Sequence, residues 1–402
     1  MINNKSGSSV VFLCIVLSAL LSISLGLVYA SHWKAVDSYS DGVIGLAGDS
    51  VLSEFDYFIQ KDYGLFLLQG NDRDFSRKMR NYTSYSLDVL DGVNLKNCTV
   101  SGSRYSIMNV DLITNQILSY MKTAGAVQSL RDEEHQWSQT DSSEGRHTLR
   151  HGPTIISLPS RLFPAQSIIQ KAEAAADGMN DLSLVFKSGT SKYLLDSYVL
   201  SKFNLDTVKN ADDHFFRNEV EYILSGKLSD EENVKKTDLA LKAIRFPTNL
   251  AHIYADPEKS AAVTALAETI TPGILGTVTQ AGISAAWAAA ESINDVRLLH
   301  AGYKVPLVKD AASWAVDVES LLHKGDENYI RPEINKGKTY DDYLRILLFL
   351  EDDDVKTARI LDLIQINMRR NYDADFLIQE CSSGIAINAQ VNRNQYVFDK
   401  IY

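Results

Sequence analysis

The chain has 402 residues and a formal net charge of −11. Its composition, 45% hydrophobic and 23% charged, is that of a globular protein able to bury a core. The acidic balance repels phosphate groups, and the lysines and arginines are scattered along the chain. We therefore expect no nucleic acid among its partners, and no attraction to anionic lipid headgroups.

Residues 10–30 form an apolar run without charge or proline, VVFLCIVLSALLSISLGLVYA. About 20 such residues in a helix span a hydrocarbon core of roughly 30 Å, and the helix pairs its own backbone groups inside lipid. The run predicts a transmembrane helix whose partner is the lipid bilayer. Within it, the small residues Ser18, Ser22 and Gly26 let another membrane helix approach, or simply moderate hydrophobicity.

A cleaved signal peptide is the alternative interpretation of this run. Lys5 gives a basic start, and residues 28–30 resemble a small-residue cleavage site. The run is longer than the roughly 7–15 apolar residues usual in a signal peptide, which favours a retained anchor. The short N-terminal tail favours a cytoplasmic N-terminus, with the bulk of the chain extracellular.

The next segment mixes helical and extended patterns. Residues 35–60 keep apolar side chains at helical spacing, which predicts an amphipathic helix continuous with the membrane span. Its three glycines, at 42, 45 and 48, weaken this helix or let another helix approach closely. Further along, the patterns predict helices at 72–85 and 111–122, and short strands within 87–112.

A polar stretch, 131–163, is the predicted linker, and a helical body follows it. Within that body, Ser229 opens a capping box and Pro257 stands at the first position of a helix. Residues 274–290 are apolar enough to suggest a second membrane span, but Gln280 and the flanking charges favour a buried helix. Helices are predicted at 164–178, 191–203, 281–299, 340–350 and 355–370.

These patterns predict an α+β, predominantly helical fold: an N-terminal transmembrane helix, then an extracytoplasmic domain with a small antiparallel sheet and a large helical body. The strand-rich tail, 376–402, is expected to pack with the 87–112 region. Cys98 and Cys381 lie in these two segments and could form a disulfide if both join one sheet. The predicted parts are 1–30, 31–130, 131–163, 164–375 and 376–402.

Catalytic chemistry has no recognisable motif in this chain. His147 and His151 have a spacing that could hold a metal on a helix, but they lie in the polar linker. The acidic run at 351–354 lacks the pattern of a calcium loop and precedes a helix, where carboxylates are favoured. We therefore predict a protein that is not an enzyme, with no catalytic residue, cofactor or metal.

Several acidic residues nevertheless fall on otherwise apolar helices. Glu291, Asp295 and Arg297 share an alanine-rich helix and predict a buried ion pair or network rather than an acid–base pair. Glu219 and Glu221 are the other candidates for this buried polar network.

Several short runs, taken together, carry a resemblance that covers nearly the whole chain. They are GSSVVFL at 7–13, DSVLSEFD at 49–56, DYGLF at 62–66, NQILSYMK at 115–122, NEVEYILSGK at 218–227, AWAAAES at 286–292, KVPLVK at 304–309 and YLRILL at 343–348. The chain resembles a family of uncharacterised proteins from Clostridia and related Gram-positive bacteria, encoded beside genes for the Tad (tight adherence, Flp pilus) machine.

The N-terminus also resembles the TadE/TadG minor pseudopilins, which begin with a short tail, a glycine and a membrane helix. This resemblance implies that 31–130 is a pseudopilin-like region and that Gly7 and Ser8 form a prepilin-peptidase-like site. One position departs from the pattern, because Phe12 replaces the glutamate usual five positions after the glycine. That departure counts against cleavage after Gly7.

The resemblance implies a non-enzymatic accessory or minor pseudopilin-like component of a Tad/Flp pilus assembly or secretion system, with pilus membrane proteins or other pseudopilins as partners. The alternative is a membrane-anchored extracytoplasmic binding or sensory domain unrelated to pili. That alternative predicts a concave pocket with convergent polar groups, which we would seek first near Glu219, Glu221, Glu291 and Arg297.

Overall fold

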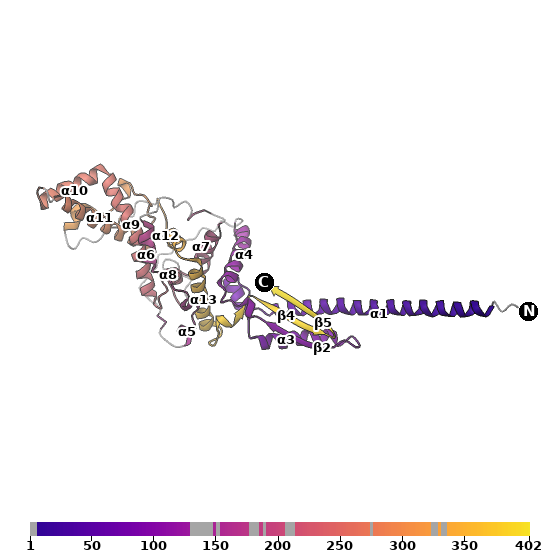
Figure 1. The fold of residues 1–402 in the computed structure, drawn as a ribbon. Coiled ribbons are helices and arrows are strands. Elements are labelled where there is room, and N and C mark those ends of the chain that lie inside the picture. The colour runs from indigo at the N-terminus through magenta and orange to yellow at the C-terminus, as the bar shows by residue number, and fades with distance from the viewer. Residues whose placement is uncertain are drawn as a thin grey trace, which may run out of the picture. The chain divides into compact units, whose positions relative to one another are not determined.

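The structure is a computed structural model. It describes residues 6–128, 148–149, 153–176, 185–187, 190–205, 214–273, 276–322, 329–330 and 336–402. The chain divides into two compact units (Figure 1). Unit 1 comprises Met1–Asp56, Phe66–Ile107 and Glu380–Tyr402, and unit 2 comprises Tyr57–Leu65 and Met108–Gln379.

Unit 1 begins with one long helix, α1, from Ser6 to Leu52. The predicted continuity of the membrane span with the amphipathic segment is confirmed, since no break separates them. The helix ends earlier than predicted because the backbone N–H groups of Ser53 and Glu54 close terminal turns. The chain then extends, and the N–H of Asp56 bonds to the carbonyl of Leu67.

The rest of unit 1 contains the helix α3, a short 3-10 helix (η1, Ser103–Tyr105) and two antiparallel sheets. Helix α3, Asp72–Leu87, is capped by the Asn71 side chain, which accepts from the N–H groups of Arg73 and Asp74. A two-stranded sheet joins β1 to β3, and a three-stranded sheet has the order β2-β4-β5. The strands are β1 Leu68–Gln69, β2 Leu95–Ser101, β3 Cys381–Ser382, β4 Gly384–Val391 and β5 Asn394–Ile401.

The three-stranded sheet brings distant parts of the chain together. Strand β2 lies in the 87–112 region, whereas β4 and β5 lie in the tail, so the two segments pair. The β4–β5 hairpin turns through two residues, and Asn392 has a φ of 52° there. Asparagine tolerates this left-handed conformation, which matches the twist of a two-residue hairpin.

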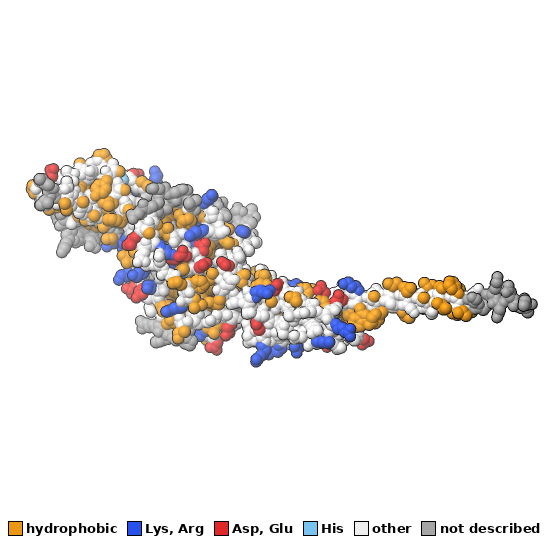
Figure 2. All heavy atoms as spheres, viewed as in Figure 1, with side chains coloured by type: hydrophobic (Ala, Val, Ile, Leu, Met, Phe, Trp, Pro, Cys, Tyr) orange, Lys and Arg blue, Asp and Glu red, His pale blue; other side chains and the backbone are white. Residues whose placement is uncertain are grey.

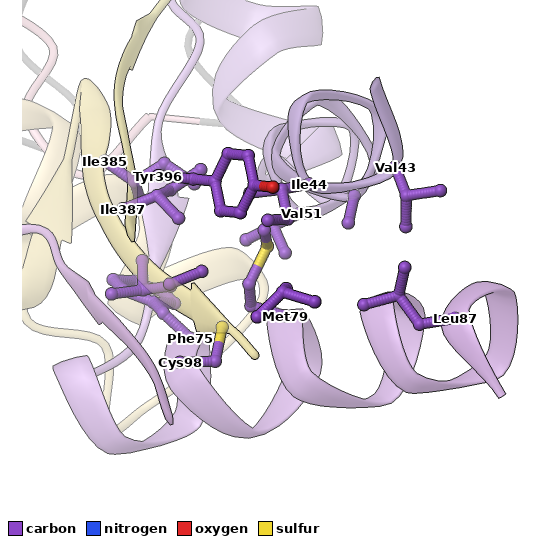
Figure 3. Close-up of a cluster of buried hydrophobic side chains, with 14 of the residues drawn as sticks. Val43, Ile44, Val51, Phe75, Met79, Leu87, Cys98, Ile385, Ile387 and Tyr396 are labelled. Carbon is purple, nitrogen blue, oxygen red and sulfur yellow. The ribbon is translucent and has the colours of Figure 1, made fainter. Parts of the chain in front are cut away.

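An apolar cluster fills the space between α1, α3 and the sheet (Figure 3). Helix α1 contributes residues that recur with helical periodicity, as a helix with one buried stripe does: Val43, Ile44, Ala47, Val51 and Leu52. Close approach depends on Gly48, where an added Cβ would lie 2.6 Å from Cδ1 of Ile387. The glycine therefore admits a sheet strand, not the helix that the sequence suggested, while Gly42 has nothing within 4 Å of such a Cβ.

Unit 2 is predominantly helical. Its elements are α2 Tyr57–Tyr63, α4 Val110–Gln128, α5 Pro153–Ile156, η2 Pro159–Leu162, α6 Ile168–Ala176, α7 Ser191–Lys202, α8 Glu219–Ser225, α9 Asp230–Ala255, α10 Pro257–Ile270, α11 Gly276–His300, η4 Ala311–Ser313, η5 Val318–Leu322, α12 Tyr340–Leu350 and α13 Asp353–Asn371. Helix α13 lies at the centre, with every residue from Val355 to Met368 buried. It packs against α2, α4, α7 and α8.

Local sequence signals explain several ends of these helices. Pro257 stands at the first position of α10, as predicted, and the Asp256 side chain caps that helix. The predicted capping box at Ser229 is wrong, because the Ser229 side chain makes no cap hydrogen bond to α9. The next side chain, Asp230, instead accepts from the N–H groups of Arg217 and Asn218.

The α+β, predominantly helical fold is thus confirmed, but the division of the chain differs from the predicted ranges. Residues 108–128 belong to unit 2, since α4 packs on α7 and α13 through a stripe that includes Ile113 and Ile117. Helix α11 buries Trp287 and Ala288 in an apolar cluster of unit 2. Among the described residues, only α1 is long and apolar enough to cross a membrane.

Candidate functional site

The N-terminal half of α1 is an apolar helix surface. Its large side chains from Val10 to Tyr29 are mostly more than half exposed, and Figure 2 shows hydrophobic side chains along it. The 10–30 run has a helical length of about 31 Å, close to the hydrocarbon thickness of a bilayer. This half of α1 therefore has the length and composition of a single membrane span.

Aromatic and charged side chains mark the end of this apolar half. The rings of Tyr29 and Trp33 meet edge to face with centroids 6.0 Å apart. Lys34 follows at once and pairs with Asp37 at 3.6 Å. Tyrosine, tryptophan and lysine favour the boundary between lipid and water, so this order along the helix fits a membrane exit near residue 33.

The small residues of the apolar half lie on one helix face, four positions apart. The hydroxyl of Ser18 donates to the carbonyl of Ile15, and that of Ser22 to the carbonyl of Ser18, so neither hydroxyl needs a partner in lipid. A Cβ added to Gly26 would meet nothing within 4 Å. This face stays open for a second helix. Gly7 and Ser8 belong to the first turns of α1.

The second half of α1 is hydrogen-bonded to the β4–β5 hairpin and to Tyr402, which follows it. The hydroxyl of Tyr396 donates to Oδ1 of Asp37 at 2.5 Å, and the amide of Asn394 donates to the same oxygen at 2.7 Å. These two hydrogen bonds hold the pKa of Asp37 below its usual value. At the far end, the Tyr402 hydroxyl donates to the carbonyl of Leu52. The membrane helix thus continues into the folded part of unit 1 without a hinge.

A buried charged cluster lies in unit 2 on α9, α11 and the segment after α11. Lys309 pairs with Glu291 and, at 2.5 Å, with Oδ1 of Asp295. The guanidinium of Arg245 donates through Nε to Oδ2 of Asp295 at 2.9 Å, and through Nη2 to Asn249. All five side chains are at most 5% exposed. Two cations and two carboxylates therefore balance within a closed space.

The electrostatics of this cluster follow from burial and charge. Burial alone raises the pKa of Asp295, but the charges of Arg245 and Lys309 outweigh it and hold that pKa below its usual value. For Glu291, burial dominates and raises the pKa against the attraction of Lys309. Glu291 also accepts from the backbone N–H of Val316 at 2.8 Å. Each carboxylate is committed to neighbours in the protein, which suits a structural role.

The predicted single network is wrong, because the residues divide among separate centres. Arg297 is exposed, and the buried guanidinium comes from Arg245 on α9. Glu219 accepts from His214 Nδ1 at 2.6 Å and from the amide of Asn367 at 2.7 Å. Glu221, two residues on, accepts instead from the Tyr340 hydroxyl at 2.8 Å. Two positions apart within one turn of α8, these carboxylates lie about 200° apart around the helix and point in different directions.

Sequence reasoning missed Arg245, Asn249 and Lys309 as members of the cluster. Arg245 and Asn249 are four positions apart, which places both on one face of α9. Arg245 could have been identified from the sequence, because it is a charged residue among the alanines and leucines of 240–250. Nothing local marks Lys309 as buried, since it stands in an irregular segment between α11 and η4.

Cys98 and Cys381, for which the sequence allowed a disulfide, are both free and buried. Cys98 stands opposite Ala389 in the three-stranded sheet, whereas Cys381 stands opposite Gln69 in the two-stranded one. The two segments do come together, but these residues lie on different sheets and so do not face each other. Burial raises the pKa of both thiols, which keeps them protonated and unreactive.

Metal chemistry has no candidate among the residues that the structure describes, where no group of three or more His, Cys, Asp and Glu side chains could hold an ion. His147 and His151 lie outside the described residues. In the acidic run, Glu351 and Asp352 pair with Lys171 at 2.7 and 2.6 Å, and Asp353 pairs with Lys356 at 2.9 Å. Three of the four carboxylates in this run therefore pair with lysines.

Comparison with known proteins gives one result. No curated protein and no solved structure matches the chain. A family model described as a family of unknown function, DUF5702, matches residues 156–393. The match covers more than half of the chain and includes η2, α6 to α13, β3 and β4, and it ends just before β5. The chain therefore belongs to DUF5702, a family of unknown function.

Proposed function

We propose that this protein is a single-pass membrane protein without enzymatic activity, acting as a minor pseudopilin-like or accessory component of a Tad/Flp pilus assembly or secretion system. Its N-terminus is cytoplasmic, and unit 2 and the part of unit 1 that follows the membrane span are extracellular. One observation carries the proposal: α1 passes unbroken from an exposed apolar half into a half that packs against an antiparallel sheet. The same helix can therefore lie in the bilayer and hold a folded unit at its surface.

The open face of α1 supports the role of an assembly component. Ser18, Ser22 and Gly26 let a second helix approach closely, and van der Waals packing at such faces drives association in lipid. The resemblance of the N-terminus to TadE/TadG pseudopilins agrees with this use of the helix. The absence of enzymatic activity is supported by the buried carboxylates of unit 2, whose charges are balanced by Lys309 and Arg245.

The test combines topology with helix packing in the native bacterium. Protease added to intact protoplasts should remove the C-terminal tail, and deletion of the gene should change piliation. We expect Ser22→Leu to reduce cross-linking of the protein to pilus membrane components, because the larger side chain fills the open face. Ser24→Leu makes the same chemical change on another face and serves as the control.

Three outcomes contradict this proposal: a tail protected in intact protoplasts, normal pili in the deletion strain, or equal cross-linking by the S22L and S24L proteins. Any one of them removes a separate part of it, namely the topology, the pilus role or the packing face.

A second candidate function, an extracytoplasmic binding or sensory domain, is favoured by one hollow in unit 2. It has a volume of about 300 Å³, and its lining includes Lys61, Tyr63, His214 and Asn367. The buried Glu219 holds Nδ1 of His214, which orients the imidazole as a carboxylate does in many binding sites. A pilus-independent phenotype of His214→Ala, with piliation unchanged, would favour this function over the first.

A further inference from the structure

Strand β5 is an outer strand of unit 1, and within the described part of the chain one side of its backbone has no partner strand. Val391 and Asn394 close a two-residue hairpin, so alternate residues from Asn394 to Lys400 direct their N–H and C=O groups toward β4. The groups of Gln395, Val397, Asp399 and Ile401 therefore point away from β4. We call these groups the β5 edge. No backbone hydrogen bond between them and the rest of the described chain is formed.

Strand β2 forms the other edge of the same sheet, and this edge is closed to a further strand. The outward backbone groups of β2 include those of Val100, whose N–H donates to the hydroxyl of Ser76 at 2.8 Å. That hydroxyl donates in turn to the carbonyl of Val100 at 3.2 Å. Strand β2 also has a register irregularity between Leu95 and Asn97. A covering helix and a bulge are two of the devices by which proteins block unwanted strand pairing.

Such protection is weak at the β5 edge. Proteins often guard an outer strand with charged side chains, and β5 has two, Asp399 and Lys400. Both are already neutralised, since Asp399 pairs with Arg104 at 3.0 Å and Lys400 pairs with Asp49 at 2.8 Å. Val397 and Ile401, which flank them, are 67% and 54% exposed. The edge therefore combines unpaired backbone groups with exposed apolar side chains, and no proline interrupts it.

The direction of β5 limits what can pair with it. Asn394 and Tyr396 contact Asp37 near the start of the packed half of α1, whereas Tyr402 contacts Leu52 at its end. Strand β5 therefore runs parallel to α1. Fifteen helical residues rise roughly 22 Å, and the strand from Tyr396 to Tyr402 covers roughly 20 Å, so the two remain side by side.

A second copy of this chain does not fit the β5 edge, and this step rests on the proposed membrane topology. Copies in one bilayer share the direction of α1, so their β5 strands run in the same direction and cannot pair antiparallel. A symmetric parallel pair would place like backbone groups opposite each other at the same height. The β2 edge of a second copy is closed by Ser76. Among the residues that the structure describes, no segment of the chain is left to supply a strand, which favours a different polypeptide.

We propose that the β5 edge binds an extended segment of another extracytoplasmic protein, which adds a fourth strand to the sheet. Backbone hydrogen bonds to the four outward residues would supply the affinity, and alternate side chains the specificity. Beside Val397 and Ile401 the segment should present β-branched or aromatic residues. The acidic net charge of this chain favours a basic segment.

The test places a photo-cross-linking amino acid at Gln395 in the full-length protein, in membranes of the native bacterium. The matched control places it at Lys96 on the closed β2 edge. We expect an adduct from position 395 with one partner, mapped by mass spectrometry to a segment with alternating apolar residues, and none from position 96. Val397→Pro removes an outward N–H without touching the bonds to β4, and should lower the adduct about tenfold. Val397→Thr keeps the N–H and should retain it.

Protease resistance of unit 1 reports whether V397P folds, and Ile401→Pro at the strand end is the second variant, since its N–H also points outward. An adduct with a second copy of the chain, equal adducts from positions 395 and 96, no adduct at all, or an adduct unaffected by folded V397P or I401P would each overturn the proposal. Membrane fractionation of the same samples tests the anchor separately, so failure of the topology is distinguishable from failure of the edge.

Discussion

The two units of this protein bury different chemistry. The core of unit 1 is apolar: it joins α1, α3 and the three-stranded sheet through aliphatic and aromatic side chains (Figure 3). Unit 2 buries ions as well, with Lys309 and Arg245 set against Glu291 and Asp295, and Lys356 against Asp196. The first kind of core tolerates changes of charge on its surface and resists changes of volume. The second depends on every charge keeping its partner.

The largest expected effect comes from removing one buried cation of unit 2. Lys309→Met leaves Glu291 and Asp295 without their shared partner, and breaking a buried pair in this way costs about 3–5 kcal/mol. Hydrogen exchange of α11 peptides should report this loss of local stability, while peptides of unit 1 stay unchanged. The exposed Lys235→Met on α9 is the control. Equal exchange in both variants would show that the cluster adds nothing.

A pH-dependent effect should follow from Asp362, a fully buried residue of α13. Burial raises its pKa to about 6, against hydrogen bonds from Ser160 and Tyr222. Because the folded-state pKa exceeds the unfolded value, the stability of unit 2 should fall as pH rises from about 4 to about 6. The gap of about two pKa units corresponds to something on the order of 3 kcal/mol.

Urea unfolding across this pH range provides the measurement. Asp362→Asn cannot ionise, so this part of the pH dependence should disappear in that variant, while the exposed Asp354→Asn on the same helix should retain it. A wild-type protein whose stability does not change between pH 4 and 6 would contradict the assignment to Asp362.

In unit 1 the sensitive property is volume. Gly48→Ala places a methyl group against the buried Ile387, whereas Gly42→Ala meets open space on the same helix. Both gain helix propensity of about 1 kcal/mol, and overpacking costs only the first variant about 1–3 kcal/mol. Thermal unfolding should therefore rank G42A above wild type and G48A below G42A. An identical unfolding midpoint for the two variants would show that the sheet accommodates the added methyl group without loss of stability.

The smallest effect is expected at the hydrogen bonds between Asp37 of α1 and the β4–β5 hairpin. Tyr396→Phe removes the hydrogen bond that contributes most to lowering the pKa of Asp37. A carboxyl group whose pKa is lowered in the folded state stabilises the fold at pH values above its unfolded-state pKa. This stabilisation is lost as the pH falls through the folded-state pKa. The acid midpoint of unit 1 should therefore move to higher pH in Y396F. Tyr85→Phe, at an exposed position of α3, should leave it unchanged.

The sequence predicted unit 1 well because its structure depends on periodicity. The apolar run at 10–30, the stripe that includes Val43, Ile44 and Val51, and the alternation in β4 each reflect one element that buries one face. The pairing of the tail with the 87–112 region could be expected from the strand patterns. The identity of opposite residues could not, because register depends on the hairpin turn and on the bulge in β2.

Unit 2 was less accessible to this reasoning. Helix α12 and the start of α10 follow local rules, but the charge partners come from segments far apart in sequence. Arg297 was the nearest cation to Asp295 along the chain, yet Arg245 reaches it from another helix across a separation of 50 residues. Sequence spacing identifies neighbours on one helix and carries no information about which helix packs opposite. The Cys98–Cys381 disulfide fails for the same reason: the strand patterns placed both segments together but did not show that the two cysteines lie in different sheets.

The central strand of unit 1 comes from the last residues of the chain, although its long helix comes first. During synthesis, α1, α3 and β2 leave the ribosome more than 250 residues before β4 does. Until then their apolar faces lack a partner, and such long-range closure is slow. A prematurely terminated chain would therefore keep α1 but never complete the sheet. Proteases that recognise unfolded segments would thus distinguish complete molecules from truncated ones.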